Sequence, residues 1–435
     1  MLQTLKNIFS VKDIRKKVVF TIFIILLYRL GTFISVPGVD KILFMNQVGS
    51  ADGIVGTINL ISGGAFSRFS IFAMTIGPYI TASIILNLLQ MVIPSLEKLA
   101  KEGEEGKKLL GKYTKYLTIA FAVVEALGLY LNYKNYLLGP LTYGAGAALG
   151  AIMFVGTLTA GTAILMWLAD KITEYGIGNG ISILVFVGII SRIPAGATSL
   201  LSFAKGGITN VLVVAALIIA MLVVIAGVIF VQQAERRIPV NYAKKVVGRK
   251  MYGGQNTHIP MKVAMAGVIP IIFAMSFMMF PGTIIQLLTK GNPTGFWNMI
   301  YHLFSVSQGS AWYYLVIYAI LYMLLIIAFT FVYTMFIVNP VEIANQLKKN
   351  GGFIPGIRAG KNTSDYISNV LKYITAVGAV FLALVAVFPI LLQGVTTVSI
   401  TFGGTSVLII VSVALEVLKN LETQMVSRHY KGFLD

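Results

Sequence analysis

Long apolar runs separated by shorter polar connections dominate the chain. A bilayer core about 30 Å thick needs about 20 apolar residues per helix, and ten runs predict ten transmembrane helices. Outer-membrane barrels would instead show alternating strands of about ten residues. The fifth run is short and is expected to take further helix from the glycine-rich stretch before it. The runs cover residues 18–36, 71–93, 116–133, 148–168, 181–193, 211–231, 263–287, 312–338, 370–392 and 400–418.

Pro78, Pro270 and Pro389 stand out among the prolines inside these runs. A proline removes a backbone donor, so each predicts a kink in its helix. Such kinks suit helices that move or line a cavity, although kinks that serve packing alone are commoner.

The composition agrees with a membrane protein. Of the 435 residues, 57% are hydrophobic, only 11% are charged, and none is cysteine. Soluble domains carry about 25% charged residues. A cytosolic enzyme, a disordered chain and a disulfide-stapled secreted module are therefore excluded.

The basic residues predict the orientation of the chain. Lys and Arg number 34 against 16 Asp and Glu, a net charge of +18. With a cytosolic N-terminus, 27 of the 34 fall in cytosolic stretches and 6 in outer ones, and Arg29 lies within the first run. Because Lys and Arg accumulate on the cytoplasmic side, both termini are expected there. The first run has no small-residue cleavage site and is expected to be a permanent span.

Ten spans divide into two sets of five, residues 1–195 and 196–435. An odd number of spans per half starts the second half from the opposite side of the membrane. Similar halves would then be related by inverted topology, which places functional sites between them at mid-depth. The span count alone suggests this repeat.

Residues 59–69, NLISGGAFSRF, precede the second run on the outer side. At about 1.5 Å per residue they make a helix of about 16 Å, too short to cross the bilayer. They are rich in small residues and include Arg68, which would be costly in contact with lipid. The segment is either a re-entrant element in a protein-lined cavity or an ordinary surface loop.

Charged residues mark two further features. Glu125 lies near the middle of the third run, where a carboxylate is costly, and is either a neutral or hydrogen-bonded buried group or a functional one. The connections 232–262 and 338–369 are long and basic. A basic loop can enforce topology or interact with anionic lipid. Topology needs only a few of these charges, and loops of roughly 30 residues are long for mere connections, so the excess favours docking of a large acidic or polyanionic partner, such as ribosomal RNA.

Catalytic and cofactor motifs are missing. The three histidines are far apart in sequence, and Gly360-Lys361 is followed by Asn362, so neither a zinc motif nor a phosphate loop is present. No nucleophile elbow occurs. We expect no enzyme activity, no metal and no cofactor.

Five motifs occur in order along the chain. They are SGGAFSRFSIFAMTIGPYITASIILNLL from Ser62, GIGNGISILVFVGII from Gly176, NYAKKVVGRKMYGGQNTHIPMKVAMAGVIPIIF from Asn241, GGFIPGIRAGKNT from Gly351 and FGGTSVLIIV from Phe402. In these motifs the chain resembles the SecY family, which forms the channel of the bacterial Sec protein translocon. The resemblance covers essentially the whole chain.

The resemblance implies an all-α polytopic fold of two inverted five-helix halves around an hourglass channel. Such a channel passes unfolded secretory polypeptides across the plasma membrane and releases transmembrane segments sideways into it. The segment at 59–69 matches the plug that closes the outer funnel, and we call it the plug segment. Its residues are Asn59, Leu60, Ile61, Ser62, Gly63, Gly64, Ala65, Phe66, Ser67 and Arg68, followed by Phe69.

Position-by-position matching implies three further sets of site residues. Val185 departs from the isoleucine common in the family but keeps an aliphatic side chain, and Glu125 stands where relatives often carry an uncharged polar residue. The pore ring is Ile76, Ile80, Ile181, Val185, Ile272 and Ile409; the lateral gate is Thr81, Glu125, Ser276 and Phe280; and Arg249, Lys250 and Arg358 lie in the partner-docking loops.

The family also implies partners: the small membrane subunits SecE and SecG, the SecA motor or the ribosome, signal peptides and nascent polypeptides, and the surrounding lipid. Two other classes of function stay open from the residues alone. One is a secondary transporter for small solutes with inverted repeats, and the other is a membrane scaffold or receptor without a pore.

Overall fold

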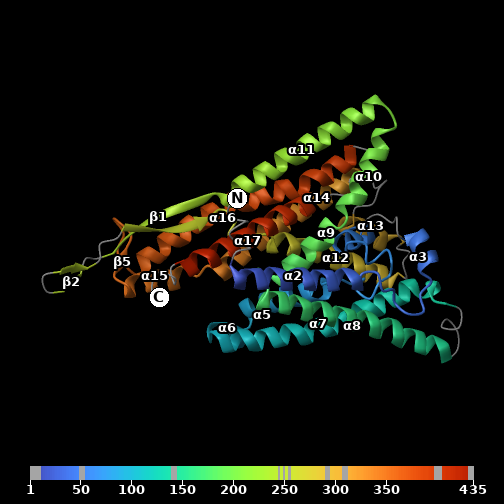
Figure 1. Ribbon diagram of the computed structural model, residues 1–435, viewed down its shortest axis with the longest axis horizontal. Helices are drawn as coiled ribbons and strands as arrows, with labels where there is room; N and C mark the ends of the chain where they lie inside the picture. Colours follow the sequence, from blue (N-terminus) through green and yellow to red (C-terminus); the bar gives the residue numbers. More distant parts are fainter. Residues whose placement is uncertain are drawn as a thin grey trace.

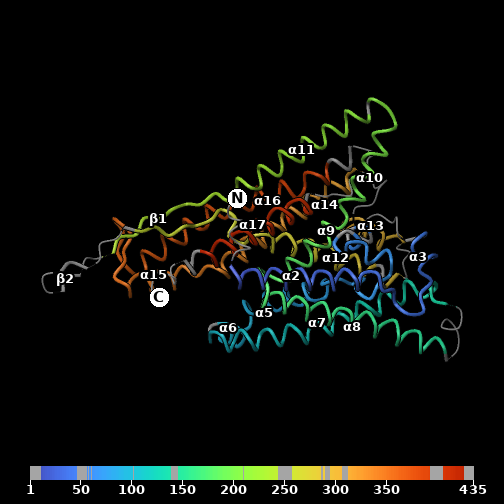
Figure 2. The backbone as a smooth tube through the Cα atoms, in the orientation of Figure 1, coloured from blue at the N-terminus to red at the C-terminus, as the bar shows by residue number. Residues whose placement is uncertain are grey.

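The computed structural model describes residues 11–48, 54–138, 145–242, 245–247, 250–252, 256–289, 294–305, 312–395 and 404–429. Long helices run side by side along the longest axis, and a small β-sheet projects from one end (Figure 1). Figure 2 traces α7 and α8 along one edge and α10 and α11 along the opposite edge. The molecule is thus a helical bundle with a β extension.

The helices are α2 (Lys12–Gly31), α3 (Lys41–Val48), α4 (Ile54–Ile61), α5 (Gly77–Val92), α6 (Pro94–Lys101), α7 (Glu104–Tyr133), the 3-10 turn η1 (Lys134–Tyr136), α8 (Ala145–Tyr175), α9 (Gly180–Ile190), α10 (Ile193–Ala204), α11 (Ile208–Gln233), α12 (Ile269–Leu288), α13 (Phe296–Phe304), α14 (Trp312–Ile337), α15 (Pro340–Lys349), α16 (Lys361–Val395) and α17 (Gly404–His429). The strands are β1 (Glu235–Tyr242), β2 (Lys245–Val247), β3 (Lys250–Tyr252), β4 (Asn256–Lys262) and β5 (Gly352–Phe353).

Each of the ten predicted runs overlaps a helix. Within the described ranges, six helices are long and apolar enough to cross a membrane. The pair α5 and α6, bent by 106°, makes a seventh if it is counted as one span. The count of ten therefore stays a prediction, although each run contains a helix.

The prediction for the fifth run was wrong in one respect. Residues 176–179 are not helical, because Asn179 caps α9 by accepting hydrogen bonds from the backbone N–H groups of Ile181 and Ser182. The additional helix lies after the run instead, where α9 and α10 together form the span Gly180–Ala204. The predicted boundary between the halves, at 195, falls inside α10.

Two of the three predicted proline kinks were also wrong. Pro78 and Pro270 lie in the first turns of α5 and α12, where the missing backbone donor costs nothing. Pro389 does lie inside its helix, α16. Pro281, which the sequence reasoning did not single out, lies inside α12.

The two halves share an irregular entry into a helix. Residues 71–76 and 263–268 are both turns, and each leads into a helix with proline in its first turn. Thr75 and Gly267 occupy the same place in the two turns, and both have positive φ, 55° and 60°. This equivalence supports a structural repeat.

The same turns make equivalent tight contacts with long helices. A Cβ built on Gly161 of α8 would lie 1.8 Å from the carbonyl oxygen of Ile71. A Cβ on Gly378 of α16 would lie 2.4 Å from the carbonyl oxygen of Val263. Ile71 and Val263 are the first residues of the two turns. In each half, a glycine on a long helix therefore lets the turn approach its backbone.

The sheet joins the two long basic connections. β1 pairs antiparallel with β4 along its whole length, and its end, Asn241 and Tyr242, pairs with β5. β1 and β4 belong to the connection 232–262, whereas β5 belongs to 338–369. Beneath the sheet, a separate apolar cluster includes Ile238, Met261 and Ile354. The sequence reasoning predicted neither the strands nor their pairing.

Both ends of the described chain meet near the sheet end of the bundle. The Lys17 ammonium donates a hydrogen bond of 3.1 Å to the Gln424 side-chain oxygen. Ile14 and Leu421 are buried together with Ile177. An even number of membrane crossings would bring both ends of the chain to the same side of the membrane.

Candidate functional site

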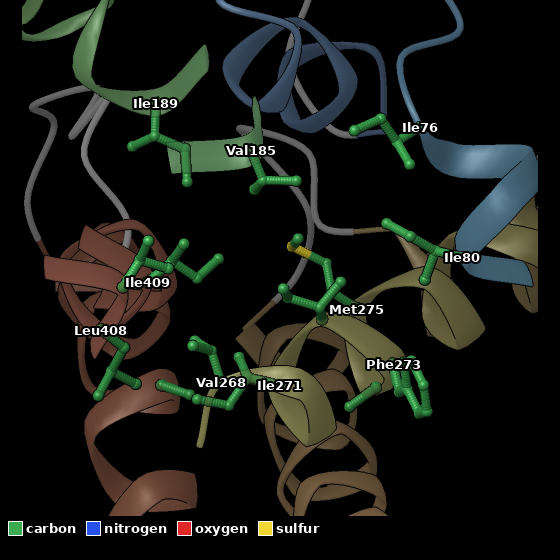
Figure 3. Packing of buried hydrophobic residues seen from close by; sticks show 14 of the residues in the cluster. Ile76, Ile80, Val185, Ile189, Val268, Ile271, Phe273, Met275, Leu408 and Ile409 are labelled. Atoms are coloured by element: carbon green, nitrogen blue, oxygen red, sulfur yellow. The ribbon is translucent and has the colours of Figure 1, made fainter. Parts of the chain in front are cut away.

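The six aliphatic residues of the predicted pore ring belong to one cluster. Five of them are at most 7% exposed, and Ile181, partly buried, packs against the same cluster. They come from α9, α12, α17 and the entry to α5. Figure 3 shows side chains from these four elements meeting in one region, Ile76 and Ile80 opposite Ile409. Residues remote in sequence are thus brought together inside the bundle.

The sequence reasoning missed several members of this cluster. Val268, Met275 and Leu408 are buried in it, as is Ile189 of α9 (Figure 3). Val268 holds the place in its turn that Ile76 holds in the first half. The equal positions of the two prolines and of the two turn segments could have identified it from sequence.

A cavity of about 120 Å³ lies beside the cluster. Its walls come from α5, α7 and α12, with Ile58 and Ile61 of α4 at one side and Val185 of α9 at another. All four predicted gate residues line it: Thr81, Glu125, Ser276 and Phe280. The volume is sufficient for several water molecules.

An aromatic contact spans this cavity between the two halves. The rings of Phe121 on α7 and Phe280 on α12 stand edge to face, 6.4 Å apart. Edge-to-face pairs of this kind contribute about 0.5–1.5 kcal/mol beyond their buried area. The α7–α12 contact therefore depends partly on one aromatic pair.

Glu125 is a half-buried carboxylate in this largely apolar cavity. A Cβ on Gly77 would lie 4.0 Å from its Oε1 atom, so the carboxylate faces the start of α5. Among the residues of known placement, none donates a hydrogen bond to it. The described residues thus supply no hydrogen-bonded form of this carboxyl, and a neutral buried group and a functional group are the two interpretations that remain.

The plug segment is formed by the end of α4 and the turns that follow. Asn59, Ser62 and Phe66 are at most 4% exposed, which contradicts the alternative of an ordinary surface loop. The Asn59 side chain accepts a hydrogen bond from the backbone N–H of Ser67, and the Ser62 hydroxyl accepts one from that of Phe66. The segment therefore satisfies much of its own backbone. The side chain of Leu60 lies outside the described part.

Two neighbouring side chains of α2 hold the plug segment through its backbone carbonyls. The Tyr28 hydroxyl of α2 donates to the Ser62 carbonyl at 3.4 Å, and Arg29 Nη1 donates to the Gly63 carbonyl at 3.3 Å. The same Arg29 nitrogen donates to the Ser191 hydroxyl, at 3.0 Å, at the end of α9. Arg29 of α2 thus links the plug segment to the end of α9.

Glycines allow the plug segment to approach α9 closely. A Cβ on Gly188 would lie 2.1 Å from the Ile61 carbonyl oxygen, and one on Gly63 would lie 2.8 Å from the Gly188 carbonyl oxygen. Gly63 also has a φ of +63°, which disfavours other residues. Ile61 packs against the aliphatic cluster and lines the same cavity as Ile80 and Val185, so the plug segment lies against the cluster that contains the predicted ring.

The described residues contain no group of three or more His, Asp or Glu side chains that could hold a metal ion.

The SecY family model matches residues 70–418, which is most of the chain. The chain belongs to the SecY family. It is 44% identical, over the full length of both chains, to the protein translocase subunit SecY of Halalkalibacterium halodurans. It is 41% identical to that of Bacillus licheniformis, again over the full length of both.

Solved SecY-family channels share the fold. A protein-conducting channel superposes with a TM-score of 0.72 at 22% identity, covering 95% of this chain and 93% of the other. Sec61 in the canine ribosome–channel complex gives 0.66 at 20% identity, with the same coverage. These likenesses confirm the predicted all-α polytopic fold.

Of the three basic residues predicted for partner docking, the structure describes only the side chain of Arg358. Arg249 lies outside the described residues. Lys250 begins β3, and its side chain lies outside them too. Arg358 is exposed between β5 and α16, and its carbonyl accepts a hydrogen bond from the Thr363 hydroxyl. The backbone at Arg358 is therefore tied to the first turn of α16.

Proposed function

We propose that the chain is the channel subunit of a protein translocase. It passes unfolded secretory polypeptides across the plasma membrane and releases transmembrane segments laterally into the lipid. The convergence of six aliphatic side chains from four elements, with the plug segment against them, carries this proposal. SecY family membership supports it.

An aliphatic constriction suits a channel for polypeptides. Hydrocarbon side chains offer neither water nor ions a hydrogen-bonding partner, so a narrow apolar passage dewets and seals. The same side chains yield around a passing chain without selecting one sequence. A small-solute transporter would need polar coordinating groups at this depth instead.

Photo-crosslinking from the ring positions tests the channel. A photoreactive amino acid is placed at residue 76, 80, 181, 185, 272 or 409, and a secretory chain is stalled during export. We expect crosslinks to the stalled chain from each position. The control position, Ile219, lies on α11 and is 63% exposed at the outer face of the bundle. Equal crosslinking from residue 219, or none from the ring, would refute the proposed path.

The plug segment is proposed to close the channel at the end opposite the sheet. Its burial and its contacts with α2 and α9 support this role. Deleting residues 62–67 removes the turns that contact Arg29 and Ser191, and should raise the ion conductance of the reconstituted channel. An unchanged conductance would leave these turns without a sealing function.

The cavity between α5, α7 and α12 is proposed to be the lateral gate. It lies between the two halves, and its mixture of apolar and hydroxyl side chains suits an entering signal helix. The Glu125 carboxylate is costly in such surroundings, so Glu125→Gln should stabilise the closed gate. We expect fewer signal-sequence variants to be exported, with Glu104→Gln, at the exposed start of α7, as the control. Unchanged signal selectivity would remove any special role for Glu125.

The sheet end is proposed to face the cytosol, with both termini. There the loops carrying Arg249, Lys250 and Arg358 would dock the SecA motor or the ribosome. SecE and SecG are proposed as small membrane partners on the basis of family membership. No covalent chemistry is assigned to the chain itself, so the energy for transport would come from the docked partner.

A further inference from the structure

Three arginines from different elements gather around the plug segment, at the end of the bundle opposite the sheet. Arg29 comes from α2, Arg68 from the plug segment, and Arg192 from the junction of α9 and α10. A Cβ on Gly64 would lie 3.4 Å from Arg192 Nη1 and 3.7 Å from Arg68 Nη2. On the adjacent Gly63, it would lie 2.9 Å from Arg29 Nη1.

A shared aromatic ring brings two of these groups together. The Cζ atoms of Arg68 and Arg29 lie 4.4 and 5.8 Å from the centroid of the Phe33 ring. Among the described residues, the Arg68 side chain contacts this ring but forms no hydrogen bond and no ion pair. The ring can stabilise the cations through its face, but it supplies no negative charge.

The cluster lacks anionic partners among the described residues. None of the ion pairs in this part of the chain includes Arg29, Arg68 or Arg192. Nη1 of Arg68 and Nε of Arg192 are buried, and neither has a hydrogen-bond partner. Buried guanidinium donors without partners are costly, and three like charges repel one another. An anion bound between the three guanidinium groups would offset both costs.

We propose that Arg29, Arg68 and Arg192 form a binding site for a phosphate group. Guanidinium forks match the oxygens of a tetrahedral oxyanion and donate charge-assisted hydrogen bonds to them. One phosphate would satisfy the two free nitrogens and offset the repulsion. The group is either the headgroup of an anionic phospholipid or free inorganic phosphate.

Such an anion would tie the plug segment to its surroundings. Arg68 moves with the plug segment, whereas Arg29 and Arg192 belong to the surrounding helices. Phosphate shared by all three resists displacement of the plug segment. This site goes beyond the proposed transport function, because anion binding can be measured without any exported protein.

The absence of cysteine from the chain allows a direct test. Ser67, whose hydroxyl donates to the Gly64 carbonyl at 3.0 Å, is replaced in S67C, and the full-length protein is reconstituted in phosphatidylcholine nanodiscs. The rate of maleimide labelling is then measured in phosphate and in chloride at equal ionic strength. At ten times the half-saturating phosphate concentration, we expect the rate to fall about tenfold.

Arginine variants identify the site. In S67C carrying Arg68→Gln and Arg192→Gln, the labelling rate should not depend on phosphate. Arg68→Lys keeps the charge but loses the fork, and should retain only part of the protection. Lys205→Gln removes a charge at the exposed end of α10 and should leave the protection unchanged. Equal protection in the double variant, or loss of protection in Lys205→Gln, would overturn the site.

A second measurement uses the chain without S67C, in case that substitution disturbs the fold. Phosphate should raise the thermal unfolding midpoint of the unmodified protein relative to chloride, and should not do so for the double arginine variant. If phosphate raises neither midpoint, or both equally, the proposal fails.

The source of the phosphate group is distinguished with lipids. S67C is reconstituted with and without phosphatidylglycerol, in buffer free of inorganic phosphate. Protection by phosphatidylglycerol alone supports a lipid headgroup as the ligand. Protection by inorganic phosphate alone supports the free ion. Protection by neither contradicts the site.

Discussion

At the scale of single residues, glycines decide how closely backbone segments approach. Gly188 faces the Ile61 carbonyl at a distance that excludes any side chain. A plug segment that packs backbone to backbone leaves little room for water between itself and α9. The seal at this point therefore depends on the absence of a Cβ atom.

Gly188→Ala should loosen this contact. The added methyl must displace the Ile61 backbone, and overpacking of this kind costs about 1–3 kcal/mol. We expect a higher ion conductance of the reconstituted channel and a lower thermal midpoint. Gly111→Ala, where a Cβ meets nothing within 4 Å, is the control. Equal behaviour of the two variants would show that the contact does not contribute to the seal.

The ring residues illustrate how far sequence reasoning reaches at this scale. The i, i+4 spacing of Ile76 and Ile80 shows only that two isoleucines are close in a helical frame. In a membrane helix, an apolar side chain suits lipid as well as a protein interior. Only the resemblance singled out the six positions, and it gave no reason to include Met275. Their convergence could be seen only in three dimensions.

At the scale of elements, the apolar runs predicted the position of every long helix. They failed at the entries to α5 and α12, because residues 71–76 and 263–268 are as apolar as the helices that follow. Hydropathy cannot distinguish a buried turn from a helix. The prolines marked both helix starts, but proline inside an apolar run was interpreted as a kink. The strands were missed because the connections were assessed for charge and not for alternation.

Gly161 offers a test of the turn–helix contact in the first half. Gly161→Ala places a methyl against the Ile71 carbonyl and should lower stability by about 1–3 kcal/mol. Gly156→Ala, in the same helix with nothing within 4 Å, should instead raise it by up to about 1 kcal/mol, because alanine favours helix. Thermal denaturation of the two variants should shift in opposite directions. Shifts of the same sign would show that the contact between Gly161 and the Ile71 carbonyl does not determine the stability of the protein.

Lys262, at the end of β4, makes stability depend on pH. Partial burial, together with the neighbouring Lys419, lowers the pKa of Lys262 from 10.5 to about 8; Glu235 and Glu416 oppose this shift. Below pH 8 the Lys262 ammonium is charged in both the folded and the unfolded state. The folded state then carries the full free-energy cost of a partly buried charge beside Lys419. Between pH 8 and 10.5 the unfolded state binds more protons, so stability rises with pH relative to a variant without the amine.

Lys262→Met should therefore be more stable than the original chain near pH 7.5, and this advantage should shrink as pH approaches 10.5. Thermal midpoints of the two proteins across this range measure the difference. Lys348→Met, at an exposed position in α15, should show no such trend. A constant difference between the Lys262 variant and the original chain would contradict the assigned cause.

At the scale of the whole molecule, two connections remote in sequence become one surface. The sheet pairs β1 with β4 and β5, and thereby joins Glu235–Tyr242 and Asn256–Lys262 to Gly352–Phe353. Charge counting treated them as two separate basic loops. A partner that docks on this surface would contact both halves of the chain at once, which no single loop would allow.

Arg358→Glu should weaken docking of an anionic partner without affecting assembly. Reversing an exposed charge should lower ribosome binding and reduce the slope of log affinity against log salt by about one. Motor-driven export should fall in parallel, while the amount of channel in the membrane stays constant. Lys134→Glu, in the turn η1 after α7, is the control: it reverses a charge outside this sheet and should leave ribosome binding unchanged. Loss of assembly in the Arg358 variant would make the loop a structural element instead.

The sheet also has a mechanical consequence. β1 continues directly from α11, and the Val263 N–H donates to the Ala234 carbonyl at 3.0 Å where β4 leaves the sheet. From there a single turn reaches Val268 in the aliphatic cluster. Tension applied to the sheet would therefore reach the aliphatic cluster through only the six residues 263–268. Gripping the sheet would strain the proposed constriction before any polypeptide has entered it.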